Sequence, residues 1–195
     1  LEFTDINNAA FVGGVFNPLT DIGLWVEGNG DINFWGTPKL AWGYGVTSDP
    51  TWLPGDEIVQ GPLNYSEITA GGFASYTPGS PLRSTPAPNS VVLPTFNLTR
   101  GVKLTGQPGK NGHYRNVSSK VSTLKYTEIA HFGVPVLGRY PVHFHLMGEA
   151  SRGAVVEGVV VKHSGPHAFV PHLSNAITFQ DCIAYDIQDQ PYWYD

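Results

Sequence analysis

The chain has 195 residues, of which only 14% are charged, and it is rich in glycine (23) and proline (16). This balance favours a turn-rich, all-β protein over a helical one, and the length suffices for one domain with a substantial core. The net charge of −5 at pH 7 argues against a nucleic-acid partner and against a polybasic membrane patch. No apolar run approaches the ~20 residues that cross a bilayer, and the single cysteine, Cys182, excludes an intrachain disulfide.

The N-terminal part, residues 1–60, is predicted to be rich in loops. Strand candidates are separated by Asn-Pro, Gly-Asn-Gly and Asp-Pro turn signals; they lie at residues 10–15, 23–27, 31–35 and 57–60. Residues 61–95 are rich in Pro, Gly and Ser, which predicts a long loop or an insertion. We therefore expect a lead-in region at 1–60, an insertion at 61–95 and a regular β structure at 96–195.

The last third of the chain contains an internal repeat. Residues 154–164 superpose on 176–186 at an offset of 22, and residues 124–133 superpose on 156–165 at an offset of 32. Strand-sized repeats rich in β-branched residues are typical of a solenoid. We predict a right-handed parallel β-helix in which the ten extra residues of the longer coil loop out around 139–149. Stacking of the coils would bring His131, His163 and Tyr185 close together.

One short motif, His143-Phe144-His145, combines two imidazoles with strand alternation. Side chains two apart share a face of a strand, so both histidines would project together. Such a pair is half of a metal site or an acid–base pair. It is equally compatible with two polar residues on a sheet surface.

Three N-glycosylation sequons begin at Asn64, Asn97 and Asn116 and are compatible with an extracellular glycoprotein. An acidic polysaccharide would require a local basic cluster in this acidic chain. Four residues are candidates for it, or for a solvated surface: Lys103, Lys110, Arg115 and Lys120.

A family resemblance rests on the run Gly138-Arg-Tyr-Pro-Val-His-Phe-His-Leu-Met-Gly148 and on three later segments: 160–164, 168–172 and 184–186. These segments resemble the cell-migration-inducing, hyaluronan-binding protein family and its transmembrane relative, which carry a G8 domain followed by parallel β-helix repeats. Residues 36–42 and 52–59 look like the end of such a G8 domain. The resemblance implies an extracellular, carbohydrate-active β-helix that acts on hyaluronan or a similar acidic polysaccharide.

Three positions depart from the family pattern. Pro166-His167 replaces an Asn-Arg pair, and Asn175 and Gln190 each replace a histidine. A relative that kept the scaffold and lost the activity fits these departures as well as an active one does.

The first functional hypothesis is a polysaccharide hydrolase or lyase. Its predicted catalytic residues are Arg139, His143, His145 and His163; its substrate-binding residues are His167, His172 and Trp193. The imidazoles would supply acid and base, and the guanidinium would hold a substrate carboxylate. A divalent metal, Zn²⁺ or Ca²⁺, would be bound by His143, His145 and His163.

The second hypothesis is a non-catalytic module of a filament, fibre or surface protein. The chain opens and stops in mid-pattern, so we expect a fragment of a longer polypeptide, or coil ends that a homo-oligomer or a neighbouring chain covers. In a third hypothesis the histidines form a structural metal site between coils, with no open coordination position.

Overall fold

The computed structural model describes residues 2–3, 23–44, 49–60, 64–69, 72–75, 94–107 and 111–194. The chain divides into two compact units, one made of residues 1–36 with 101–195 and the other of residues 37–100. The expected strand at 10–15 lies outside the described residues. No helix in the described ranges is long and apolar enough to cross a membrane.

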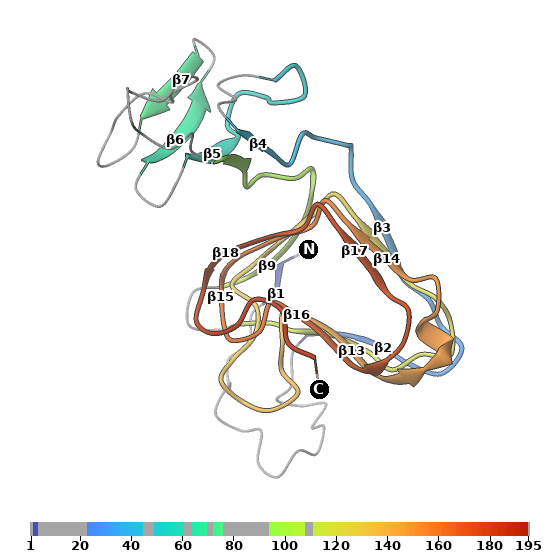
Figure 1. Cartoon of the computed structure of the whole chain (residues 1–195). Helices are drawn as coiled ribbons and strands as arrows, with labels where there is room; N and C mark the ends of the chain where they lie inside the picture. The colour runs from blue at the N-terminus through green and yellow to red at the C-terminus, as the bar shows by residue number, and fades with distance from the viewer. Residues whose placement is uncertain are drawn as a thin grey trace. The chain divides into compact units, whose positions relative to one another are not determined.

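The first unit is a parallel β-helix with three sheets, which form the three sides seen in Figure 1. Sheet A contains β1 (Glu2–Phe3), β9 (Val102–Gly106), β12 (Thr127–Ala130), β15 (Val160–Ser164) and β18 (Ile183–Ile187). Sheet B contains β2 (Leu24–Val26), β10 (Tyr114–Asn116), β13 (Val142–Gly148) and β16 (Phe169–Ser174). Sheet C contains β3 (Asn33–Trp35), β11 (Thr123–Lys125), β14 (Val155–Glu157) and β17 (Thr178–Gln180). Every strand pair in these sheets is parallel, which confirms the predicted β-helix.

The second unit is an antiparallel sheet, sheet D, in the order β4-β8-β5-β6-β7. Its strands are β4 (Trp42–Tyr44), β5 (Glu57–Gln60), β6 (Asn64–Thr69), β7 (Gly72–Ser75) and β8 (Pro94–Asn97). Asp56 is buried here: Lys39 Nζ and Asn97 Nδ2 donate to its carboxylate at 2.6 and 2.8 Å.

The structure places the boundaries of these units differently from the predicted ones at 60 and 95. Strands β2 and β3 pair in parallel with β10 and β11, so residues 23–36 form a coil of the β-helix and are not a lead-in region. Strands β6 and β7 lie in the stretch that was expected to be a loop. Neither strand contains a proline, because the prolines that suggested a loop lie outside them, at positions such as 62, 78 and 81.

The coil register confirms one predicted offset and corrects the other. Leu124 pairs with Val156, at the expected offset of 32. Val160 pairs with Ile183, an offset of 23 where 22 was predicted. A slip of one residue moves every side chain of a strand to the opposite face, so the correction decides which residues line the core.

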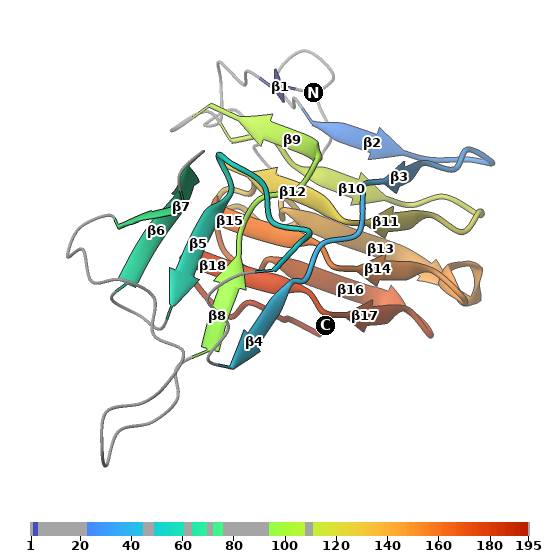
Figure 2. The ribbon, with the colours of Figure 1, turned by 90° about the horizontal axis from the view of Figure 1, so that it is seen from above.

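The extra residues of the longer coil do not form one loop around 139–149, because Val142–Gly148 is strand β13. They are divided between the connection 131–141, which follows β12, and the 3₁₀ turn η2 (Glu149–Ser151), which follows β13. Figure 2 shows the successive coils lying side by side, with β13 between β10 and β16.

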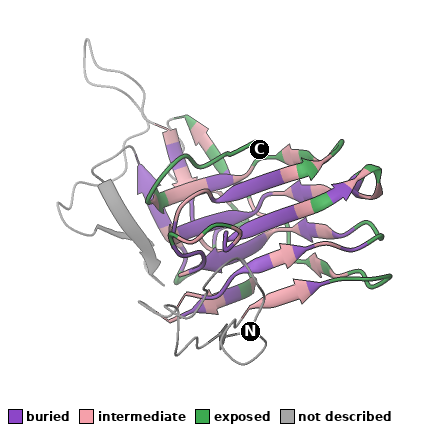
Figure 3. Ribbon diagram, turned by 90° about the horizontal axis from the view of Figure 1, so that it is seen from below, coloured by how far each residue is buried: buried purple, intermediate pink, exposed green. Residues whose placement is uncertain are grey.

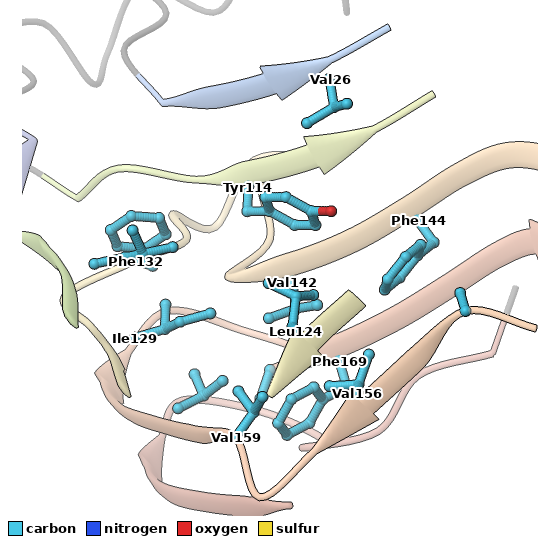
Figure 4. Packing of buried hydrophobic residues seen from close by; sticks show 14 of the residues in the cluster. Val26, Tyr114, Leu124, Ile129, Phe132, Val142, Phe144, Val156, Val159 and Phe169 are labelled. Carbon is cyan, nitrogen blue, oxygen red and sulfur yellow. The ribbon is translucent and has the colours of Figure 1, made fainter. Parts of the chain in front are cut away.

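The core fills the space between the three sheets. Alternating apolar residues project inward, and the strands that surround the core are largely buried in Figure 3. Figure 4 shows the layers, for example Val142 and Phe144 of β13 near Phe169 of β16. All three side chains are fully buried, and burial of such a side chain contributes about 1.5–3 kcal/mol.

Residues with left-handed backbone form a column near the C-terminal ends of the sheet A strands. His131, His163 and Asp186 have φ of 54°, 48° and 52° and occupy equivalent positions on successive coils. His and Asp adopt this conformation more readily than most residues. This backbone conformation therefore explains why His and Asp recur at these equivalent positions.

Two of the three sequons are buried. The amide of Asn97 donates to Asp56, and the amide of Asn116 donates to Ser122 Oγ at 2.8 Å and to Tyr114 Oη at 3.2 Å. Both asparagines are 0% exposed, so neither is accessible for glycosylation in the folded chain. The side chain of Asn64 lies outside the described residues.

Candidate functional site: a histidine cluster on sheet B

Strand β13 holds the two predicted histidines on the outer face of sheet B. Val142 and Phe144 belong to the core cluster, and alternation therefore directs His143 and His145 outward. The register between β13 and β16 is regular up to His145 and shifts before Gly148. The apolar inner positions thus fix the orientation of both imidazoles.

A third histidine completes the cluster. His172 of β16 is the register partner of His145, and their Nδ1 atoms lie 2.9 Å apart. His145 Nδ1 lies 3.2 Å from His143 Nε2. The other ring nitrogen of His143, Nδ1, lies 3.0 Å from the carbonyl oxygen of Gly138 and donates to it. That bond leaves Nε2 of His143 with its lone pair toward the cluster.

The cluster opens into a pocket with a volume of about 110 Å³. The connection 131–141 forms one wall and the two strands form the other. The lining residues are Leu137, Gly138, Tyr140, His143, His145, Val170 and His172. None of them is acidic, so a glycosidase centre with two carboxylates is not built from this lining.

Burial favours the neutral form of His143 and His145. Removal from water lowers the pKa of His143 to about 3, although its bond to the Gly138 carbonyl opposes the shift. Burial also lowers the pKa of His145 to about 4, and the charge of Arg115 adds to the effect. Neutral imidazoles are competent as metal ligands or as bases, but they carry no proton to donate as strong acids.

The geometry fits a transition metal. One ligand nitrogen from each of His143, His145 and His172 can be chosen so that all lie within 4.8 Å of one another. A tetrahedral Zn²⁺ with Zn–N bonds of 2.0–2.1 Å sets its ligand nitrogens about 3.3 Å apart, close to the observed 2.9 and 3.2 Å. Ca²⁺ requires six or more oxygen ligands, so an all-imidazole set does not suit it.

Two of the predicted site residues do not belong to the histidine cluster. His163, predicted as a ligand, belongs to β15 in sheet A, where its Nδ1 lies 2.8 Å from Asp186 Oδ2. Its ring contacts His131 and Tyr185 at centroid distances of 5.8 Å, as the repeat predicted. Arg139 is 2% exposed. Burial removes it from direct contact with a polysaccharide, which corrects its predicted role in binding a carboxylate.

The other predicted substrate residues form an aromatic row beside the pocket. Trp193 stacks on His167 with ring centroids 4.6 Å apart, and His167 contacts Tyr140 at 5.4 Å. Tyr140 in turn packs edge-on against His143 at 4.9 Å. His167 and Trp193 are therefore joined to the histidine cluster through Tyr140, a residue that the sequence did not single out.

A further residue, Arg115, was considered in the sequence only as part of a basic cluster. It is the register partner of His143 on one side and of Trp25 on the other. Its guanidinium carbon lies 4.5 Å from the centre of the Trp25 ring. The basic cluster itself is not formed by the described members: Lys103 lies on β9 of sheet A and pairs with Glu128 at 3.4 Å. Lys110 lies outside the described residues.

Comparison with known proteins shows what this β-helix is similar to. Residues 110–192 match the family model of the CEMIP β-helix. The chain is 35% identical over 69 residues to human cell surface hyaluronidase CEMIP2, covering 32% of this chain and 5% of the relative. It is 30% identical over 181 residues to the human cell migration-inducing and hyaluronan-binding protein, covering 70% of this chain and 13% of the relative.

Mouse fibrocystin-L is 33% identical over 66 residues, which is 33% of this chain and 2% of the relative. The chain therefore spans at most 13% of the length of these three relatives. The matched segment 110–192 contains β10, β13 and β16, the three strands that build the histidine cluster and its border. The resemblance predicted from the sequence is confirmed: the coils built from residues 110–192 are a β-helix of the CEMIP type.

Proposed function

We propose that this chain is an extracellular, carbohydrate-active β-helix that binds a hyaluronan-like acidic polysaccharide at the pocket of sheet B. The observation that carries the proposal is the convergence of His143, His145 and His172 at a pocket on the outer face of a CEMIP-type β-helix. The names of two relatives, a cell surface hyaluronidase and a hyaluronan-binding protein, support the substrate class and the extracellular location.

The chemistry we propose at the pocket uses a transition metal, with Zn²⁺ as the best match to three imidazole ligands. His143, His145 and His172 would hold the ion, and the bond from His143 to Gly138 would orient one ring. A metal bound in this way supplies Lewis acidity toward a sugar oxygen. Three protein ligands leave a fourth position for substrate, which distinguishes this site from a closed structural one.

The low pKa values of His143 and His145 support the role of ligand over that of general acid. The absence of a carboxylate from the pocket lining supports a metal-assisted reaction over hydrolysis by paired carboxylates. A metal-assisted reaction is compatible with hydrolysis and with β-elimination next to a uronate. The two reactions give different products, which an assay distinguishes.

The test is calorimetric titration of the 195-residue chain with hyaluronan oligosaccharides of one length, in the presence and absence of Zn²⁺. We expect saturable binding that the double variant His145→Ala/His172→Ala abolishes, while Arg152→Ala, at an exposed turn residue paired with Glu149, binds as the parent does. New reducing ends in the product would identify hydrolysis, and ultraviolet absorbance of an unsaturated uronate would identify elimination. A parent chain that binds no acidic polysaccharide would overturn the proposal.

Binding without turnover is the second candidate function. The observation that favours it is the loss of histidines at Asn175 and Gln190 relative to the family pattern. In that case the same titration gives saturable binding, and neither kind of product accumulates.

A further inference from the structure

Arg115 carries a positive charge that has no role in the proposed function. Its side chain is half-buried on the outer face of sheet B, directly beside His143 in the register of the coils. Its Nε atom is buried and has no hydrogen-bond partner. Within the described part of the chain, no carboxylate forms an ion pair with this guanidinium.

An unpaired, partly desolvated cation is unfavourable in a folded protein. Burial lowers the pKa of Arg115, in accord with this cost. Natural proteins keep such a group when a ligand supplies the missing charge. An anion that binds beside the pocket would complete the pairing.

The neighbouring residues hold the guanidinium in a fixed plane. Trp25 Nε1 donates to Glu27 Oε2 at 3.0 Å, which anchors the indole ring. The guanidinium lies over that ring, with 4.5 Å between its carbon atom and the ring centre. Stacking uses the face of a guanidinium and leaves its terminal NH₂ groups to a planar, bidentate acceptor, whereas the buried Nε of Arg115 does not take part.

The surroundings of Arg115 lack competing negative charge on the pocket side. The pocket lining contains no acidic residue. A carboxylate is the planar bidentate partner that arginine binds best.

We infer that Arg115, stacked on Trp25, is the carboxylate-binding subsite of the pocket and selects polysaccharides that contain uronic acid. The inference rests on the proposed function, because it assigns the acidic group of that ligand to one residue. Arg115 thus takes the role that the sequence gave to Arg139, whose side chain is buried. A chain with this subsite distinguishes an acidic glycan from a neutral glycan of the same length and linkage.

The experiment compares two ligands and four proteins. The ligands are a hyaluronan oligosaccharide and its carboxyl-reduced, uncharged counterpart of equal length. The proteins are the parent chain, Arg115→Gln, Arg115→Lys and the control Arg152→Gln at an exposed arginine, all titrated at one ionic strength because charge effects are screened by salt. Circular dichroism of each variant checks that the β-helix is folded.

We expect the parent to bind the acidic ligand at least about tenfold more tightly than the neutral one, as one charge-assisted bidentate contact provides. Arg115→Gln should lose this preference and retain the weak affinity for the neutral ligand. Arg115→Lys keeps the charge without the bidentate geometry, so its preference for the acidic ligand should be intermediate. This variant tests the inference even if Arg115→Gln is unstable. Arg152→Gln should behave as the parent does.

Three results would contradict the inference in different ways. Arg115→Gln that keeps the full preference for the acidic ligand overturns the subsite and leaves the proposed function intact. An equal loss of affinity for both ligands assigns Arg115 to pocket structure and also overturns the subsite. A parent chain that binds neither ligand overturns the proposed function and the subsite together.

Discussion

The Nδ1 atoms of His145 and His172 lie 2.9 Å apart because the two residues are register partners on neighbouring coils. Each follows an apolar strand segment whose inner positions are fixed by the core. The distance is short enough for a hydrogen bond, in which one imidazole N–H donates to the other ring, and also for two ligands of one metal ion. The predictions below separate these alternatives and test the fold around them.

Zinc binding should depend on His172 and not on His163. His172 contributes a nitrogen to the cluster, whereas His163 is bonded to Asp186 in another sheet. Loss of a residue that only orients a ligand already costs about 10- to 100-fold in metal affinity, so His172→Ala should cost at least that. The measurement is elemental analysis combined with calorimetric titration of Zn²⁺ into the metal-free chain.

The matched control for this prediction is His163→Ala, which should bind zinc as the parent does. Zinc should also raise the melting temperature of the parent, because a ligand of the folded state stabilises it by mass action. Equal zinc binding by the parent and by His172→Ala would show that the cluster is a hydrogen-bonded group and not a metal site.

Gly158 should tolerate alanine far less well than Gly153. Both have positive φ, +61° and +89°, and a Cβ at Gly153 would meet nothing within 4 Å. At Gly158 the same atom would lie 2.5 Å from the ring of Tyr126, whose hydroxyl donates to Glu157 at 2.7 Å. We expect Gly153→Ala to destabilise the chain by about 1 kcal/mol, because of backbone strain alone. Gly158→Ala should cost about 3 kcal/mol, because overpacking adds to the strain.

Urea unfolding of the two variants measures this difference. In a Tyr126→Ala background the excess cost at Gly158 should disappear, since the ring that obstructs the new Cβ is gone. An excess that persists without the ring would refute steric overlap as the cause.

Stability should fall as the pH decreases from about 6.5 to about 4. Burial, with a smaller contribution from the charge of Arg115, lowers the pKa of His113 from 6.5 to about 4. Between these values the unfolded chain binds a proton that the folded chain does not, so the free energy of unfolding decreases with decreasing pH. For His113 alone the loss is about 3 kcal/mol at pH 4, because one pKa unit corresponds to 1.36 kcal/mol.

The variant His113→Gln isolates this contribution from those of the other histidines. Its free energy of unfolding, measured by urea titration across this pH range, should change less steeply than that of the parent. Identical slopes for the two proteins would exclude His113 as a buried neutral group.

Asn97 and Asn116 should carry no glycan when the chain is secreted from animal cells. Their side chains are 0% exposed and bonded to buried polar partners. Mass spectrometry of tryptic peptides tests this directly, and a glycan at either site in folded protein would contradict the burial. Asn116→Ala should destabilise the chain by about 1–3 kcal/mol, because its buried partners lose a hydrogen bond.

The sequence predicted the architecture because its repeat is carried by apolar residues that lie in the core. Leu124 and Val156 match in type and in inward orientation, and their register was correct. The offset between the last two coils was wrong by one residue because the superposition aligned Val160 with Cys182. In the structure Val160 pairs with Ile183, while Cys182 lies beside the core at a corner.

The histidine cluster was predicted only in part. His143 and His145 were found from alternation within one strand, which needs no knowledge of the neighbouring coil. The third member depends on the offset of 27 between β13 and β16, which places His172 beside His145. That offset matches neither repeat, because the extra residues of the long coil lie in two separate turns.

The insertion between β3 and β9 has a consequence for the order of assembly. Trp25 and Arg115 are neighbours across 90 positions of sequence, whereas later coils pair across 23 to 32. Closing the longer loop costs about 1 kcal/mol more in chain entropy, which delays the first coil relative to the others. The antiparallel pairing of Trp42 with Phe96 draws the ends of the insertion together, and once it has formed the remaining loop is short. The pairing of β4 with β8 therefore shortens the loop that must close when Arg115 meets Trp25, and it favours formation of the first coil.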